Sequence, residues 1–476
     1  MNRRECLKGS AVLVSASLLG GCGAQEGSSA AAGASAAGAQ PADAYETGRV
    51  PIADSGWTAP TGVLPGYPVL DRDLDAAVVV VGAGLAGSSL ALALAEAGVD
   101  VVVLEAHQPA WGASGRNAGH VLPTLKERSV FEHFPDGGKA FLELFREHHT
   151  ITFDLARRHG IDCDATQSGY LHATNRSSVF DKLKAASAYW RDEQGQRIEY
   201  LSGSEMEAMT GSRYYTLGVL YRSGGRVNPY LFTNGMIGAA VSRGARVFGD
   251  SEAVSLMRVG KRWRVATAQG AVNAERVVFC TNAYSNAIVP QLSNSFYPLT
   301  AYAISTLPLS PEARAVVMPG GATLAQEPVD LNPLVVDEHG RIIVSSIPSS
   351  SQADDARGAF ARHLAWIHRT WPETRGMDIR MQDYWTGRVA LRDREFPGAY
   401  QLEPGVFGLM HFNAWGNLMA PLLGTALGSA LAADRMDRLP FPLERPQAVA
   451  NPGKQELIIR RLAIPAARIG QRLGII

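Results

Sequence analysis

Three glycines, Gly82, Gly84 and Gly87, have the G-x-G-x-x-G spacing of a loop that holds a pyrophosphate. In such a loop the first glycine permits a tight turn, and the second lets phosphates approach the backbone at a helix N-terminus. The third lets helix and strand pack closely. Because this spacing also occurs by chance, the motif needs support from its surroundings.

The segments on either side of the glycines provide that support. An apolar, β-branched run at 77–81 precedes them, an Ala/Leu-rich run at 88–97 follows, and a second apolar run at 101–104 ends at Glu105. A buried strand, a helix and a second strand in this order form the unit that binds dinucleotides, and its terminal acid accepts hydrogen bonds from a ribose. The sequence therefore predicts a dinucleotide site formed by Gly82, Gly84, Leu85, Ala86, Gly87, Glu105 and Ala106.

The next segment bears on which dinucleotide binds, since the motif alone leaves FAD and NAD open. Residues 111–120 read W-G-A-S-G-R-N-A-G-H, and such small residues suit a backbone that passes close to a large planar ligand. Here the chain resembles the FAD-dependent amine and amino-acid oxidoreductases of the glycine oxidase, sarcosine oxidase and D-amino-acid oxidase superfamily. It is most similar to the γ-glutamylputrescine oxidoreductase branch, which has G-A-S-G-R-N-G-G at this place.

Three further regions are similar to the same family. They are a helical stretch at 227–245 with a strand residue Val254 after it, the V-V-F-C-T-N-A-Y stretch at 277–284, and a last strand and helix at 385–397 and 412–424. The resemblance implies FAD, and because sarcosine oxidases attach flavin through a cysteine that 385–397 lacks, it implies non-covalent FAD. It assigns to the cofactor Ala113, Ser114, Arg116, Asn117, Val254, Thr281, Asn282, Gly416, Asn417 and Leu418.

The resemblance also implies an α/β fold with two interleaved domains. A Rossmann-like FAD-binding domain would comprise 74–135, 222–290 and 383–440. An α+β substrate domain with an antiparallel sheet would comprise 136–221 and 291–382. Apolar runs at 302–307 and 341–345 are expected strands of this second domain.

The family's reaction removes a hydride from the carbon beside a neutral amine, passes it to flavin N5 and leaves an imine that water hydrolyses. The helix starting at Gly416 would direct its N-terminal partial charge at the flavin. Two alternatives are a flavin dehydrogenase of a 2-hydroxy acid and a non-catalytic protein that FAD only stabilises. The electron acceptor, oxygen or a membrane quinone, stays open. The substrate stays open too, because 332–335 (N-P-L-V) departs from the family's substrate strand.

Five side chains are candidates for the substrate side of the flavin. Arg388 would bind a substrate carboxylate or bridge the domains. Tyr302 would face the substrate or pack in the core, and His120 and His411 would flank the flavin or be structural. Trp415 would form a bulky apolar wall.

The N-terminus resembles a twin-arginine export signal that ends in a lipobox. Arg3 and Arg4 precede a short apolar run and L-G-G-C, which ends at Cys22. This pattern predicts a signal peptide at 1–21 and a lipid on Cys22, which would anchor an exported protein to a bacterial membrane on its periplasmic side. The Ala/Gly/Ser-rich stretch within 22–65 predicts a flexible tether.

The C-terminal residues 454–476 predict an amphipathic tail. Its helical spacing puts Ile458, Leu462, Ile469, Leu473 and Ile476 on one face and Arg461, Arg468 and Arg472 on another, with Pro465 as an expected interruption. Such a tail either lies on an anionic membrane surface or docks on its own domain.

Composition excludes several classes of protein. The 476 residues contain 45 Lys+Arg and 45 Asp+Glu. The chain therefore lacks the excess of basic residues that is typical of proteins that bind nucleic acids. The sequence contains no run of about 20 apolar residues, so no membrane-spanning helix is predicted. The four cysteines have no metal-ligand spacing, so no metal site is predicted, and Cys163 and Cys280 are expected to be inert thiols.

Overall fold

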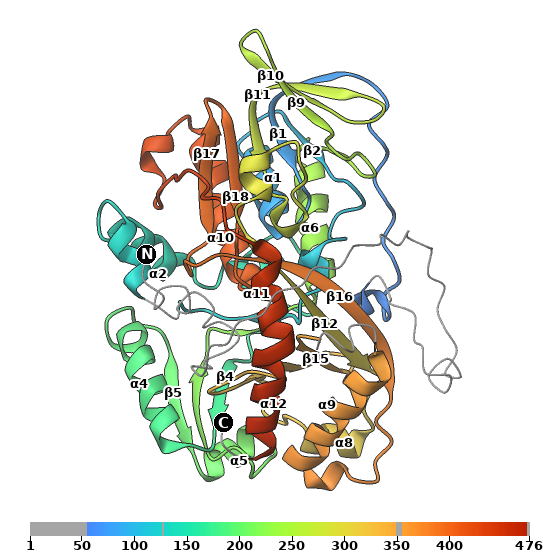
Figure 1. The fold of residues 1–476 in the computed structure, drawn as a ribbon, viewed down its shortest axis with the longest axis vertical. Helices are drawn as coiled ribbons and strands as arrows, with labels where there is room; N and C mark the ends of the chain where they lie inside the picture. The colour runs from blue at the N-terminus through green and yellow to red at the C-terminus, as the bar shows by residue number, and fades with distance from the viewer. Residues whose placement is uncertain (1–54, 126–127, 349–354, 474–476) are drawn as a thin grey trace.

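The computed structural model describes residues 55–125, 128–348 and 355–473 (Figure 1). The predicted signal peptide, Cys22 and most of the predicted tether lie outside these residues. Two large mixed sheets organise the chain. In the view of Figure 1 one occupies the upper half and the other the lower half of the molecule, and the C-terminal helices begin near the middle and run down the front of the lower half.

The first sheet contains the predicted dinucleotide-binding unit. Its central strands β1, β2, β8, β11 and β18 run parallel, and β17 and the β9–β10 hairpin add antiparallel edges. The order is β17 (Gly398–Glu403), β18 (Val406–Met410), β11 (Ala271–Phe279), β1 (Leu74–Val81), β2 (Val101–Leu104) and β8 (Arg246–Phe248), with β10 (Arg262–Ala266) and β9 (Ser255–Val259) beyond β11. The continuous valines of β1 and β2 are buried, as expected for strands covered on both faces.

Helices α1 (Leu85–Glu96), α6 (Pro229–Val241) and α10 (Gly416–Ala432) pack together against this sheet. The α1 and α10 helices approach closely because Gly424 and Gly428 present no side chain to α1. A Cβ on Gly424 would collide with Ser89, and one on Gly428 would lie 2.9 Å from Ala93 Cβ. This contact fixes the start of α10 beside the start of α1.

The second sheet is mostly antiparallel, with a single parallel pair, β13–β4, among the described strands. Its order is β16 (Met381–Leu391), β12 (Tyr297–Thr306), β15 (Ile342–Ser346), β14 (Leu334–Val336), β13 (Thr323–Gln326), β4 (Tyr170–Thr174), β6 (Leu217–Tyr221) and β5 (Ile198–Ser202). The strands expected at 302–307 and 341–345 are found here as β12 and β15. A short pair, β3 (His120–Val121) with β7 (Gly225–Arg226), lies outside both sheets.

The placement of β16 corrects one predicted boundary. Residues from 383 onward were assigned to the FAD domain, but β16 pairs with β12 from Tyr297↔Leu391 to Thr306↔Met381 and so belongs to the second sheet. The other helices are α2 (Lys139–His148), α3 (Ile151–Arg158), α4 (Ser177–Asp192), α5 (Ser204–Thr210), α7 (Pro290–Ser293), α8 (Pro311–Val316) and α9 (Ala356–Thr370).

The end of the predicted tether is part of the folded body. Residues 55–58 include the 3₁₀ turn Gly56–Thr58, and Trp57 is 1% exposed. Its indole lies in one apolar cluster with Trp385. The composition of 22–65 placed the start of the folded body too late in the chain. It could not show that one tryptophan in this segment is buried and attaches the end of the segment to the core.

The C-terminal tail docks on its own chain, the second of the two predicted arrangements. It forms α11 (Pro452–Ile458), a π-helical turn (Ile459–Ala463) and α12 (Ile464–Arg472) in one rod (Figure 1). The π turn directly before Pro465 accommodates a residue without an N–H, so the proline does not interrupt the rod. Ile459 and Ile464 are buried against the second sheet.

The predicted apolar face of the tail is its exposed face. Four of its predicted side chains are between 46% and 67% exposed: Ile458, Leu462, Ile469 and Leu473. The fifth, Ile476, lies outside the described residues, and the neighbouring Leu457 is 45% exposed. The sequence contains two apolar stripes on one rod, and the helical spacing alone does not say which of them is buried. Among the helices of the described residues, none is long and apolar enough to cross a membrane.

Candidate active site

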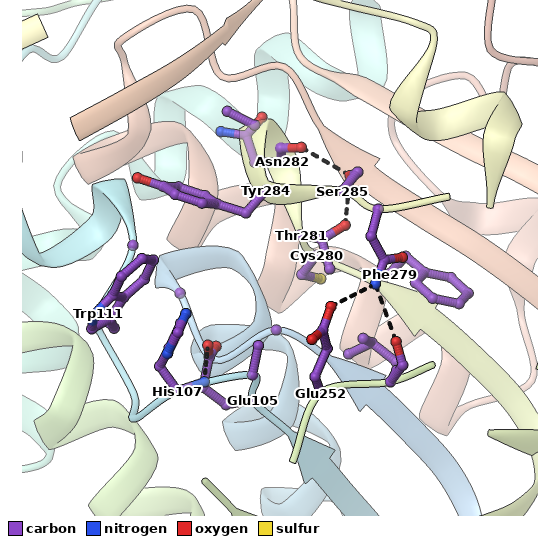
Figure 2. A pocket seen from close by; sticks show the side chains of 18 of the residues that line it. Glu105, His107, Trp111, Glu252, Phe279, Cys280, Thr281, Asn282, Tyr284 and Ser285 are labelled. Carbon is purple, nitrogen blue, oxygen red and sulfur yellow. Dashed lines mark hydrogen bonds between the residues drawn. The ribbon is translucent and has the colours of Figure 1, made fainter. Parts of the chain in front are cut away.

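Two cavities meet at the carboxyl end of the first sheet. The first lies over the ends of β1, β2 and β11 (Figure 2). The second is lined by strands of the second sheet and by segments that follow β1, β11 and β18 of the first sheet. The residues that line both are Gly84, Ala113, Ser114, Cys280 and Asn282. The two cavities are therefore parts of one elongated site, at the place where parallel sheets generally bind ligands.

The glycine motif forms the floor of the first cavity. Gly82 has φ of +102°, and a Cβ on it would lie 2.9 Å from the carbonyl oxygen of Cys280. A Cβ on Gly84 would lie 2.6 Å from Ser114 Oγ, and one on Gly87 would collide with the carbonyl of Gly82. Helix α1 starts at Leu85, so its first N–H groups face the site.

Glu105 stands at the end of β2 as predicted. Its two carboxylate oxygens accept hydrogen bonds from the N–H groups of Ala83 (2.7 Å) and His107 (3.1 Å). Burial raises the pKa of Glu105, and these two N–H groups act in the opposite direction. Fixed in this way, the carboxylate retains lone pairs for the hydroxyls of a ribose.

Aromatic rings form a wall of the first cavity that the sequence did not identify. The rings of His107 and Trp111 stack with centroids 3.7 Å apart, and Tyr284 meets Trp111 edge-on at 5.7 Å. Figure 2 shows His107 and Trp111 on one side of the cavity, with Tyr284 beyond Trp111. The available signal was position, since Trp111 opens the small-residue segment and Tyr284 ends the T-N-A-Y stretch.

The structure corrects the assignment of Val254. Its side chain is 49% exposed and lines neither cavity, and its N–H donates to the carbonyl of Ala266. The two residues before it, Glu252 and Ala253, line the first cavity instead. Side chains alternate along an extended segment, so an assignment off by one residue points the wrong side chain at the ligand.

Two indoles hold the backbone of the small-residue segment. Trp57 Nε1 donates to the carbonyl of Asn117 at 2.8 Å, and Trp385 Nε1 donates to the carbonyl of Arg116 at 2.8 Å. The hydroxyl of Ser55 donates to the carbonyl of Gly115 at 2.7 Å. Three consecutive carbonyls are thus fixed from behind by residues distant in the sequence.

The side chains of the same segment are fixed as well. Arg116 donates to the carbonyls of Trp111 (2.6 Å) and Thr386 (3.1 Å), which ties the segment to β16. The amides of Asn117 and Asn417 donate to each other at 3.0 and 2.8 Å, and Asn417 also donates to the carbonyl of His120. This network joins the segment to the first turn of α10.

The N-terminus of α10 faces the second cavity. Gly416, Asn417 and Leu418 line it, as do Leu85 and Ala86 from α1. The N–H groups in the first turn of a helix carry partial positive charge, so two helix N-termini meet the ligand site from one side.

Most predicted cofactor residues line the two cavities. Those in the first are Gly82, Gly84, Glu105, Ala106, Ala113, Ser114, Thr281 and Asn282, and those in the second include Leu85, Ala86, Arg116, Asn117, Gly416, Asn417 and Leu418. Gly87 lines neither cavity, and its function is the close packing of α1 on β1.

Three of the predicted substrate-side residues line the second cavity: Tyr302, His120 and Trp415. The Tyr302 hydroxyl is 2.9 Å from His363 Nε2 and its ring stacks on Tyr384, so it resembles the core-packed alternative more closely than the substrate-contacting one. Both ring nitrogens of His120 are buried, and neither has a hydrogen-bond partner among the described residues. Burial lowers the pKa of His120 to about 3, with a smaller contribution from His172.

Two other candidates lie elsewhere. Arg388 is exposed, and it lines the first cavity rather than the second. Its backbone N–H donates to the hydroxyl of Tyr284. The structure therefore corrects the assignment of Arg388 to a substrate carboxylate. His411 lines neither cavity. Its ring is buried between Ser295 Oγ (3.2 Å) and the hydroxyl of Tyr400 (2.8 Å), which makes it a structural histidine.

Comparison with known proteins identifies the family. The sequence model of the family described as FAD dependent oxidoreductase (DAO) matches residues 77–430. The chain belongs to this family. It is 27% identical over 424 residues to the gamma-glutamylputrescine oxidoreductase of Escherichia coli K12, an alignment that covers 86% of this chain and 96% of that protein.

Solved structures show the same fold. Glycine oxidase from Bacillus cereus superposes with a TM-score of 0.62 at 17% identity, covering 79% of this chain and all of that one. An L-amino acid deaminase from Proteus vulgaris superposes with a TM-score of 0.63 at 18% identity, covering 82% and 95%. The predicted α/β fold with FAD is confirmed, and the DAO member described here is an FAD-dependent oxidoreductase of the amine or amino-acid oxidase type.

The residues present fit FAD. The glycine floor leaves no room for a Cβ where the pyrophosphate approaches, Glu105 suits the ribose, and the His107–Trp111–Tyr284 wall suits the adenine. The second cavity, between the fixed 113–120 segment and the start of α10, would hold the flavin. Cys280, at the junction of the cavities, has its pKa raised to about 12 by burial, so it is a protonated thiol and a poor nucleophile.

Proposed function

We propose that this DAO-family protein oxidises a primary or secondary amine or an amino acid to an imine, which water then hydrolyses to a carbonyl compound. In this reaction the carbon beside the nitrogen loses a hydride, the nitrogen lone pair forms the C=N bond, and bound FAD supplies the hydride acceptor. The observation that carries the proposal is the second cavity, because it continues the FAD site into a space walled by the second sheet.

The residues of that cavity have distinct tasks. The N–H groups at the start of α10 stabilise negative charge that the cofactor takes up. Trp415 and Leu418 exclude water beside them. His120 is held neutral by burial, so it accepts or donates one hydrogen bond without adding charge next to the reacting carbon.

An anaerobic reduction assay tests this proposal. The FAD-loaded protein is mixed with polyamines, simple amines, N-methyl amino acids, D- and L-amino acids and 2-hydroxy acids, and the visible absorbance of the flavin is followed. We expect bleaching by at least one amine, faster at higher pH because only the neutral amine reacts. Bleaching by 2-hydroxy acids alone would favour the dehydrogenase alternative, and no bleaching by any compound would favour the non-catalytic one.

We also propose that the protein is exported and held at a membrane by a lipid on Cys22, and that a membrane quinone takes the electrons. The support is the twin-arginine and lipobox pattern, together with the exposed apolar side chains along α11 and α12. The paired change Leu462→Ser and Leu473→Ser tests whether the tail contributes to membrane binding. It should weaken the binding of the chain without its lipid to phosphatidylglycerol vesicles. Unchanged vesicle binding would remove the tail from this account.

A further inference from the structure

We propose that the substituent on the reacting carbon of the substrate is apolar, an alkyl or aryl group, and that it ends against a wall closed by Ile464 of the C-terminal rod. This inference rests on the proposed amine oxidation and names the class of amine. Ile464 lies after residue 430, where the match with the family model ends, so membership of the family does not account for this wall.

One end of the second cavity is a continuous apolar wall. Ile464 belongs to a cluster of packed apolar side chains that joins the rod to the second sheet, and it is 1% exposed. The members of this cluster that also line the second cavity are Leu299, Leu331, Ile347 and Ile464. Val389, which packs against the cluster, lines the cavity as well. The rod therefore completes a wall that the second sheet begins.

The pairing of β12 with β16 places this wall beyond the small-residue segment 111–120. Ala301 pairs with Gly387, and a Cβ on Gly387 would lie 3.4 Å from Arg116 Cβ. Two residues further along the ladder, Leu299 pairs with Val389. Alternate residues of a strand point to the same side, and two residues span about 7 Å. The ladder thus presents small side chains beside the segment that would hold the flavin, and larger apolar ones farther along the cavity.

The charged groups at this end of the cavity are balanced in sign. Two carboxylates line the cavity and two guanidiniums lie beside it in the part of the chain that the structure describes, those of Glu327, Asp330, Arg362 and Arg468. Farther along the rod, Arg460 and Glu456 pair with each other at 3.6 Å. Because the two signs balance, neither a distal ammonium nor a distal carboxylate on the substrate gains a net attraction.

Both carboxylates take part in bonds within the protein. Glu327 Oε1 is 3.0 Å from Nδ1 of His172 on β4. Asp330 Oδ1 accepts a hydrogen bond from the N–H of Gln326 at 3.1 Å. These bonds fix the loop that follows β13, so the structure gives the two acids a task that needs no ligand.

The two guanidiniums are bonded to the protein in the same way. Arg468 donates to the carbonyl of Ile347 at 3.0 Å, which ties α12 to the end of β15. Arg362 on α9 bonds to the hydroxyl of Tyr302, whose ring packs in the apolar cluster beneath α9. Both cations therefore attach helices to the second sheet.

The surface that remains for the far end of a substrate is apolar. An ammonium or a carboxylate placed against leucine, isoleucine and valine side chains loses its water and gains no new partner, which is costly. A methylene buried there improves binding by about three- to fourfold. An alkyl or aryl chain is therefore the substituent that this wall accommodates best.

A series of primary amines tests the inference on the FAD-loaded full chain. The compounds n-propylamine to n-heptylamine differ only in the number of methylenes. We expect the apparent Kd in anaerobic flavin reduction to fall about three- to fourfold for each added methylene until the chain reaches the wall, and to rise beyond that length.

Two matched compounds test whether the far end must be apolar. In 1,4-diaminobutane an ammonium replaces the terminal methyl of n-pentylamine, and in 5-aminopentanoate a carboxylate replaces it. Both should bind at least about tenfold more weakly than n-pentylamine. If amino acids reduce the flavin and simple amines do not, 2-aminohexanoate, 2,5-diaminopentanoate and 2-aminohexanedioate provide the same comparison.

Substitution of Ile464 should move the chain length that binds most tightly. Ile464→Ala leaves only a methyl group at the wall and should lengthen the preferred chain by about two carbons, whereas Ile464→Phe should shorten it. A general loss of stability would not move the preference in opposite directions. If an Ile464 variant holds no FAD, Ile347→Ala at the same wall should also lengthen the preferred chain.

Ile459 provides the matched control. It is a buried isoleucine of the same rod and the same apolar cluster, and it lines neither cavity. Ile459→Ala should therefore lower the melting temperature without changing the preferred chain length.

The outcomes separate this inference from the proposed function. Equal binding of all chain lengths, or tightest binding of a compound with a charged far end, would overturn the inference and leave amine oxidation standing. A preferred length that is the same in the wall variants and in the unchanged protein would overturn the assignment of the wall to Ile464. Reduction of the flavin by no amine and by no amino acid would overturn both the inference and the proposed function.

Discussion

Replacing Trp57 by Phe should weaken FAD binding although Trp57 touches neither cavity. The change removes the donor that binds the carbonyl of Asn117 at 2.8 Å and leaves that partly buried carbonyl without it. A buried polar group that loses its partner costs about 1–3 kcal/mol. If the segment relaxes in the free protein and must be reordered on binding, this cost raises the Kd of FAD by about 5- to 150-fold.

The chain offers a matched control for this variant. Trp371 is also fully buried, and its Nε1 donates to the carbonyl of Thr210 at 2.7 Å. Trp371 belongs to the apolar cluster that packs against the second sheet, and it lines neither cavity. Titration of the FAD-free protein with FAD, followed by flavin fluorescence, should show weaker binding for Trp57→Phe and unchanged binding for Trp371→Phe, while both variants melt at lower temperature. Equal FAD affinity in the two variants would refute the idea that Trp57 positions the small-residue segment for FAD binding.

Three further predictions concern the cofactor, acid stability and export. Acid precipitation should release all flavin into the supernatant because the FAD is non-covalent, and Glu105→Ala should weaken its binding; flavin in the pellet would contradict the first statement and unchanged affinity the second. His120 and His363 have pKa values lowered to about 3 by burial, so the unfolded chain takes up protons first as the pH falls below about 6.5, and stability should fall from there toward pH 3 by at most about 2 kcal/mol per histidine at pH 5. Urea midpoints that do not change between pH 7.5 and pH 5 would exclude this contribution. Replacing Arg3 and Arg4 by Lys should leave unprocessed precursor in the cytoplasm, and normal amounts of mature protein in the membrane fraction would refute twin-arginine export.

The part of the site that the sequence predicted is the part built from short-range spacing. The strand–glycine–helix–strand unit needs only about 30 consecutive residues, and each glycine is required by a neighbour nearby in the fold. The structure therefore has Gly82, Glu105 and the start of α1 where the motif put them. The start of α10 was also located, because the resemblance covered that helix.

The part that the sequence missed depends on contacts between distant residues. Trp57 and Trp385 donate hydrogen bonds to the small-residue segment 111–120 from 60 and 269 positions away in the chain. No local sequence pattern encodes such a contact. The pairing of β16 with β12, which places β16 in the second sheet, is also a contact between distant segments. The assignment of Val254 was off by one residue, and its side chain is exposed.

The tail shows a different limit of sequence reasoning. Both stripes of the C-terminal rod are apolar, so amphipathic spacing could not decide which one is buried. Ile464 packs inward and lines the second cavity, whereas Leu462 and Leu473 face outward. The choice is made by the apolar surface of the second sheet, which the tail sequence does not contain.

An anaerobic single turnover with product analysis tests the central claim most directly. FAD-loaded protein is mixed without oxygen with an excess of each primary amine, amino acid or 2-hydroxy acid of the panel in turn, and the loss of flavin absorbance, the ammonium released and the carbonyl product are measured together. Oxidation of a primary amine predicts one ammonium and one carbonyl product for each FAD reduced, with a rate that rises with pH as the substrate ammonium loses its proton. Flavin that stays oxidised with every amine but is reduced by a 2-hydroxy acid, with no ammonium released, would contradict it.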